Sequence, residues 1–164
     1  MKKFLFSILL IIVILWSASL ILKESNIFSM DANGESLENQ VKSFASKPFL
    51  LAKIGSTPII LQEAVTGYER TLGLSGRASL PKDQGLFFVF EHPDFNYIWM
   101  KDMKFSIDIL WLDSNFKITD IVEDATPQSF PNSFAPKEKS YYVLEVNSGF
   151  VRRNGIKIGD ALEI

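Results

Sequence analysis

The sequence predicts a mainly β domain, a small closed or half-open β-barrel or sandwich with one or two short helical turns, preceded by one N-terminal transmembrane helix. The β prediction comes from the chain beyond Pro48, where short apolar runs rich in aromatic and β-branched residues alternate with turn residues. The chain has 164 residues, a length that fits one domain plus an appendage. The predicted transmembrane helix comes from residues 4–22, which contain no charged side chain.

The uncharged segment, residues 4–22, is long enough to cross a membrane. At about 1.5 Å per residue, its helix spans about 28 Å, close to the thickness of the bilayer's hydrocarbon layer. Residues 1–3 contain two lysines and form a cytoplasmic n-region, which places the rest of the chain outside the cytoplasm. The alternative is a cleaved signal peptide with its site at residues 17–19 (Ser-Ala-Ser) and a secreted product. Against cleavage, the apolar run continues through Leu22.

A polar stalk, residues 23–48, follows the apolar segment. It has few aromatic residues and a turn signal at Asn33-Gly34, as is typical of linkers. Leu37, Val41 and Phe44 recur at helical spacing within it, which predicts a short amphipathic helix over residues 35–46.

The predicted β domain covers residues 49–164 and begins with a hairpin. Residues 50–54 and 59–65 are its two strands, joined by the turn sequence Gly-Ser-Thr-Pro. Further strands are predicted at residues 86–90, 97–101, 107–112, 117–122 and 141–146.

The helical turns and loops separate these strands. Residues 68–74 and 149–154 are the predicted helical turns, the second closed by Gly155 as a C-terminal cap. Residues 124–139 contain three prolines and predict an irregular loop. About seven short strands with so few helices predict a sheet that closes on itself to hide its edges.

Charge and composition exclude several classes of function. Residues 24–164 contain 14 Lys and Arg against 19 Asp and Glu, a formal charge of 14 − 19 = −5, so nucleic acid is not an expected partner. The chain has no cysteine, and its one histidine, His92, lies beside Pro93 in a predicted surface turn. We therefore expect no metal site and no cofactor.

Several short motifs occur in the order and spacing of a known family. They are Thr66, Glu69-Arg70, Gly73-Leu74, Arg77, Leu80-Pro81, Gly85 to Phe90, Trp99-Met100-Lys101, Ile107-Asp108, Val143 to Gly149 and Gly155 to Asp160. Over roughly residues 57–164 the chain resembles the DUF192 family. The resemblance implies one small β-rich domain, often exported in bacteria and archaea, and implies no settled activity.

Three ionisable residues interrupt apolar strands and are candidates for a ligand site. Lys101, Asp108 and Glu145 each share a strand face with apolar residues, and a lone buried charge costs several kcal/mol. They therefore form a buried polar network, belong to a ligand site, or lie at strand ends in solvent. Arg77 is the natural fourth member, because its guanidinium can hold a carboxylate with two hydrogen bonds.

The aromatic residues and the carboxylates support different hypotheses of function. Trp99 and the aromatic residues of predicted loops can stack on sugars or on a partner's side chains. The first hypothesis is thus a membrane-anchored extracytoplasmic binding or accessory module that recognises an envelope glycan or protein. The alternatives are an envelope hydrolase in which Asp108 and Glu145 act as acid and nucleophile, or a purely structural partner domain.

Overall fold

The computed structural model describes residues 36–164, which divide into a helical segment and a β domain. The helix is α2, Leu37–Ala45, and its N-cap Ser36 accepts a hydrogen bond from the backbone N–H of Asn39. This confirms the helix predicted over residues 35–46. None of the helices within residues 36–164 is both long and apolar enough to span a bilayer. The predicted transmembrane segment, residues 4–22, lies outside the described residues.

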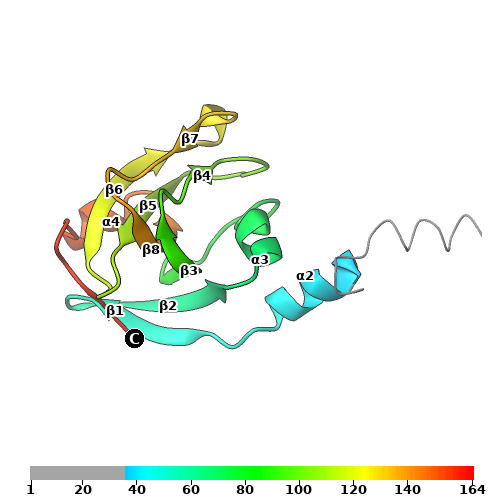
Figure 1. Cartoon of the computed structure of the whole chain (residues 1–164), viewed down its shortest axis with the longest axis horizontal. Helices are drawn as coiled ribbons and strands as arrows, with labels where there is room; N and C mark the ends of the chain where they lie inside the picture. The colour runs from blue at the N-terminus through cyan, green and yellow to red at the C-terminus, as the bar shows by residue number, and fades with distance from the viewer. Residues whose placement is uncertain (1–35) are drawn as a thin grey trace, which may run out of the picture. The chain divides into compact units, whose positions relative to one another are not determined.

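The β domain, residues 47–164, is built on a seven-stranded sheet in the order β6-β5-β8-β3-β2-β1-β9 (Figure 1). Its strands are β1 (Leu50–Ile54), β2 (Thr57–Ala64), β3 (Gln84–Asp94), β5 (Ile107–Leu112), β6 (Ile118–Ala125), β8 (Ser140–Asn147) and β9 (Leu162–Glu163). All neighbouring pairs are antiparallel except β2 and β3, which run parallel. The predicted mainly β fold and its opening hairpin are confirmed.

The sheet curls so that its two outermost strands meet at one end. Lys117, just before β6, forms an antiparallel bridge with Ala161, just before β9. The backbone N–H of Leu162 also donates to the carbonyl of Phe116 at 3.0 Å. The sheet is therefore a half-barrel whose outermost strands are joined at this point, which leaves fewer backbone groups exposed at its edges.

Two apolar layers bury the sheet on both faces. The main core lies on the face that carries Phe87, Leu110 and Leu144, and it includes Phe150 of α4 (Phe150–Asn154). Side chains alternate along each strand, so Leu86, Phe88, Ile109, Trp111 and Val143, all buried, belong to the opposite face. This second face is the one that carries Glu145.

Gly85 marks a close approach between strands at the centre of the sheet. A Cβ at this position would lie 2.8 Å from Leu144 Cδ1, 3.1 Å from the backbone oxygen of Glu145 and 3.2 Å from Ile59 Cδ1. A Cβ here would force the end of the Leu144 side chain to move and would crowd the backbone oxygen of Glu145, so this position favours glycine.

The connections differ from the predictions in three places. The strand predicted over residues 97–101 is only β4, Ile98–Trp99, which pairs with β7, Ser133–Phe134, in a separate two-stranded ribbon. β7 and a short 3₁₀ helix, Pro127–Ser129, lie within the predicted irregular loop. His92 is exposed as expected, but it lies within β3 because that strand continues to Asp94.

Candidate functional site

Glu145 is a buried carboxyl group at the middle of the sheet's second face. It lies in β8, where Leu86 of β3 and Ile109 of β5 are its partners across the sheet, and its residue is 5% exposed. Its Oε2 atom is buried and forms no hydrogen bond within residues 36–164. It is the one buried side-chain oxygen or nitrogen of these residues in that condition. Unpaired buried polar groups are rare in folded proteins, so this oxygen calls for an explanation.

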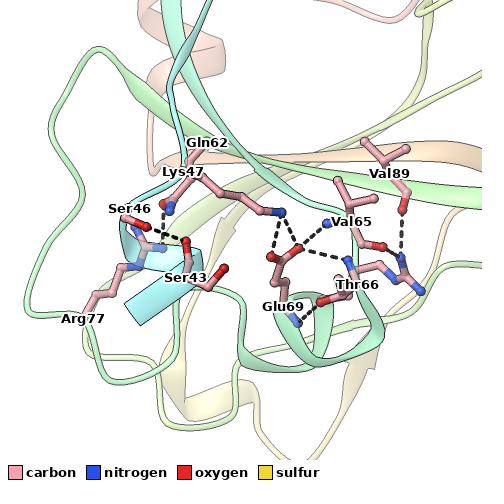
Figure 2. Close-up of polar contacts among 10 residues, drawn as sticks. Ser43, Ser46, Lys47, Gln62, Val65, Thr66, Glu69, Arg77 and Val89 are labelled. Carbon is pink, nitrogen blue, oxygen red and sulfur yellow. Dashed lines mark hydrogen bonds and ion pairs between the residues drawn. The ribbon is translucent and has the colours of Figure 1, made fainter. Parts of the chain in front are cut away.

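The surroundings of Glu145 favour its neutral form. Burial raises the pKa of Glu145 to about 8, and the positive charge of Arg77 lowers it in part. The Arg77 guanidinium lies half-buried in the loop after α3 (Gly67–Leu72), and its Nη2 donates a hydrogen bond to Gln62 Oε1 at 2.8 Å (Figure 2). Near pH 7, Glu145 is therefore mostly a carboxylic acid, which can donate a hydrogen bond.

A small cavity of about 40 Å³ borders Glu145, and we call it the Glu145 pit. Its lining residues are Arg70, Thr71, Leu72, Gly73, Leu74, Ser75, Phe88, Tyr97, Ile98, Trp99, Met103 and Glu145. The volume is enough for about three water molecules, at roughly 10–15 Å³ of accessible space for each. The pit thus combines apolar walls from Leu72, Leu74, Phe88, Ile98 and Met103 with polar groups, one of which, Glu145 Oε2, has no hydrogen-bond partner in the described part of the chain.

A wider groove of about 480 Å³ adjoins the pit, and we call it the aromatic groove. Its lining residues are Gly67, Arg70, Thr71, Phe88, Phe90, Tyr97, Ile98, Trp99 and Ser133. Tyr97 is 68% exposed and Trp99 is 45% exposed, although both are large aromatic side chains. Such a cleft, with a few polar groups among aromatic ones, is typical of small-molecule sites.

Arg70 of α3 is held in a fixed position where the groove meets the pit. Its Nη1 donates hydrogen bonds to the carbonyl oxygens of Val65 and Val89, and its guanidinium lies 5.0 Å from the centre of the Phe90 ring. Within the described chain its Nε and Nη2 donate no hydrogen bond, so both remain available to a ligand. The sequence does not mark Arg70 as a site residue, because an arginine in a predicted helical turn carries no sign of the groove beside it.

Trp99 and Lys101 lie together, but not in a buried network. Lys101 is exposed, in the turn that follows β4, and its Nζ lies 5.9 Å from the centre of the Trp99 ring. The prediction that Lys101 interrupts an apolar strand is therefore wrong, because the strand ends at Trp99. Of the predicted site residues, the structure brings Trp99 and Glu145 to one cavity, with Arg77 acting on Glu145 through its charge.

Asp108 lies apart from this site and has a complete set of partners. It is fully buried on the other face of the sheet, where it accepts hydrogen bonds from the backbone N–H groups of Asp124, Gly149 and Val151 at 3.0–3.1 Å. It therefore joins β5 to the end of β6 and to the start of α4. Asp108 does not line the pit, and the hydrolase that would pair it with Glu145 gains no support from this arrangement.

Glu69 shows how this fold satisfies a buried glutamate elsewhere. It accepts hydrogen bonds from Lys47 Nζ at 2.7 Å and from the backbone N–H groups of Val65 and Thr66 at 2.8 and 2.9 Å (Figure 2). Burial raises the pKa of Glu69, but the Lys47 hydrogen bond and charge and the two backbone hydrogen bonds outweigh it and hold the pKa below its usual value. Among residues 36–164, Glu145 has no such hydrogen-bond partner for its Oε2, which distinguishes it from Glu69.

Comparisons with known proteins agree on the fold. The DUF192 family, described as "Uncharacterized ACR", matches residues 50–164. A candidate transcription regulator from Sinorhizobium meliloti 1021 is 32% identical, with a TM-score of 0.64 over 69% of this chain and 89% of its own. A protein of unknown function from Novosphingobium aromaticivorans DSM 12444 is 26% identical, with a TM-score of 0.66 over 71% and 85%. No curated protein matches the chain. Since the match covers most of the chain and includes the whole sheet, the protein belongs to the DUF192 family.

Proposed function

We propose that this protein is an extracytoplasmic binding module that recognises a glycan of the cell envelope through its aromatic groove. The observation that carries the proposal is the exposure of Tyr97 and Trp99 on one open cleft, beside the fixed guanidinium of Arg70. Exposed aromatic rings stack on the apolar faces of sugar rings, and nearby polar groups bind the hydroxyl groups.

The groove suits a glycan better than an apolar protein segment. Arg70 offers two nitrogen atoms with N–H groups, Thr71 and Ser133 offer hydroxyl groups, and the aromatic residues are interspersed among them. An apolar helix or strand would leave these polar groups buried without partners. A chain of hydroxylated rings can supply both the flat faces and the hydrogen-bonding atoms.

Binding of soluble oligosaccharides tests the proposal. Isothermal titration of the full chain in mild detergent, with cellotetraose and with the tetramer of N-acetylglucosamine, should detect binding of at least one of them. Trp99→Ala should weaken that binding by about fivefold or more, since stacking of a flat ring on an aromatic side chain is worth on the order of 1–3 kcal/mol where it has been measured with nucleobases. Phe130→Ala is the matched control, because Phe130 is 43% exposed but does not line the groove. Equal affinity of Trp99→Ala and the wild type, or no binding of either sugar, contradicts the proposal.

The location of the module is a second part of the proposal. Residues 4–22 form an uncharged apolar segment after two lysines, which supports a single-pass anchor with the β domain outside the cytoplasm. The chain should stay in the membrane fraction after an alkaline carbonate wash and keep its N-terminus. A soluble mature chain that begins near Leu20 would instead identify a cleaved signal peptide.

A further inference from the structure

We infer that the Glu145 pit receives an acetamido group of the bound glycan, with the Glu145 carboxyl donating a hydrogen bond to the carbonyl oxygen of that group. The inference rests on the proposed function, because it assigns a particular sugar substituent to a pit that adjoins the aromatic groove. Its physical basis is a buried carboxyl oxygen, Glu145 Oε2, without a hydrogen-bond partner among residues 36–164, beside a cavity of limited size that has both apolar and polar walls.

The size of the pit limits what can enter it. At about 40 Å³ it holds about three water molecules, so it accepts a substituent and not a whole sugar ring. Arg70, Phe88, Ile98 and Trp99 line both the pit and the groove. A ring stacked on Trp99 in the groove can therefore direct a short side group into the pit.

The chemistry of the pit matches the two parts of an acetamido group. Leu74, Phe88, Ile98 and Met103 supply apolar walls that suit a methyl group. Glu145 Oε2 has no partner among the described residues, and a carbonyl oxygen is an acceptor that a protonated carboxyl can satisfy. A hydroxyl group alone would leave the apolar walls of the pit without a contact.

Hydrogen bonds link the two segments that contribute walls of the pit. The Ser75 hydroxyl donates to the backbone oxygen of Lys101 at 2.8 Å, and the backbone N–H of Gly76 donates to the oxygen of Asp102 at 2.9 Å. These bonds connect the loop after α3 to the turn after β4. A site that is already formed loses little conformational entropy when the ligand binds.

The charged and titratable groups around Glu145 determine how binding depends on pH. Arg77, from the loop after α3, acts on Glu145 through its charge, while Arg70 of α3 and Tyr97 before β4 also line the pit. The partners of Glu145 on β3 and β5 are the apolar residues Leu86 and Ile109. Burial raises the pKa of Glu145 to about 8, so the carboxyl loses its donor proton as the pH passes through that value. Binding that uses the proton should weaken above pH 8.

An acetylated peptide is the other class of ligand with the same chemistry. Acetyl-lysine carries its acetamido group on a four-carbon stem, which needs a deep channel. The small volume of the pit and the wide aromatic groove beside it favour a ring that lies directly at the entrance.

Two tetramers with the same β-1,4 linkage test the inference, because they differ only in the substituent at carbon 2. At pH 6.5 the full chain should bind the N-acetylglucosamine tetramer about tenfold or more tightly than cellotetraose, as expected for one good buried hydrogen bond plus a filled apolar space. For the wild type this preference should decrease between pH 7 and pH 9. Glu145→Gln, which keeps a donor, should retain the preference without this pH dependence, and Glu145→Leu should lose it.

The possible results separate this inference from the proposed function. If both tetramers bind equally and Trp99→Ala weakens both, the groove binds glycans and the acetamido assignment is wrong. If neither tetramer binds, both the proposed function and the acetamido assignment are wrong. Binding of an acetyl-lysine peptide in place of the N-acetylglucosamine tetramer also overturns the inference. The pH titration of the wild type needs no variant, so poor folding of Glu145→Leu does not prevent a decision.

Discussion

Asp108 and Glu145 lie on neighbouring strands of one sheet, yet their side chains point to opposite faces. Asp108 is paired with Val146, whereas Glu145 is paired with Ile109, so the two carboxyl groups are one position out of register. Because side chains alternate along a strand, a shift of one position moves a side chain to the other face. The two acidic residues that look equivalent in the sequence therefore have different surroundings, and this difference leads to the first two predictions.

Asp108→Ala should destabilise the protein strongly. The substitution leaves three backbone N–H groups without their acceptor, two of them in buried hydrogen bonds and one in a part-buried one, at a cost of about 3–5 kcal/mol in the free energy of unfolding. Urea unfolding of the full chain measures the loss. The exposed Glu138→Ala is the control and should change stability by less than about 0.5 kcal/mol. A loss below about 1 kcal/mol for Asp108→Ala would show that these hydrogen bonds contribute little.

Glu145→Gln should remove a dependence of stability on pH. The pKa of Glu145 is raised from 4.5 to about 8 in the folded state, so between these values the folded protein holds a proton that the unfolded chain has released. The wild type should therefore be most stable below pH 4.5 with respect to this group, and should lose stability as the pH rises toward 8. The slope is about 1.4 kcal/mol per pH unit at most.

Unfolding curves of the wild type and of Glu145→Gln between pH 5 and pH 9 test whether stability falls as the pH rises. Glutamine has the same shape and no charge, so the variant should gain stability relative to the wild type as the pH rises. Glu63→Gln, at a half-buried position of β2, is the control for the substitution of a glutamate by glutamine elsewhere in the sheet. A constant difference between Glu145→Gln and the wild type over this range would contradict a raised pKa.

Lys47→Ala should destabilise the protein with the opposite dependence on pH. Lys47 pairs with buried Glu69 at 2.6–2.7 Å, and Glu69 keeps two backbone hydrogen bonds after the substitution, so the expected cost is about 1–2 kcal/mol near pH 7. The pKa of Glu69 is lowered in the folded state, so its contribution is present above pH 4.5 and is lost as the pH falls through the folded pKa.

Acid unfolding measures how the stability that the Lys47–Glu69 pair contributes is lost at low pH. The difference in stability between the wild type and Lys47→Ala should shrink as the pH falls below 4.5, because a protonated Glu69 no longer needs the lysine. Lys53→Ala is the control, since Lys53 pairs with Glu163 at the surface, where both side chains are more than half exposed. Equal losses for the two lysine variants would argue against a special role for the Lys47–Glu69 pair.

Gly85→Ala should destabilise the centre of the sheet. The added methyl group meets a backbone oxygen at 3.1 Å and two packed side chains at 2.8 and 3.2 Å, and the expected cost is about 1–3 kcal/mol. Gly67→Ala is the matched control, because a Cβ at Gly67 meets nothing within 4 Å. Thermal unfolding should separate the two variants by several degrees, and equal melting temperatures would show that the sheet can adjust around residue 85.

Much of the fold could be predicted because its signals are local. The hairpin, the buried strand at residues 107–112 and the short helices follow from the alternation of apolar residues, from turn residues and from caps. The end of the strand at Trp99 could not be predicted in this way. The ribbon of β4 and β7 joins residues about 35 positions apart, and nothing in either short segment specifies that pairing.

The sequence by itself determined three features of the chain. They are a domain-sized β region without cysteine, an uncharged N-terminal segment, and acidic residues within apolar strands. Only the tertiary structure decided what those residues do. The register of β5 against β8 gives Asp108 three N–H partners, whereas Glu145 keeps one oxygen, beside a cavity, that no described residue pairs. The reason is physical: the state of a buried carboxyl depends on the charges, donors and solvent within a few ångströms, and segments distant in the sequence supply them.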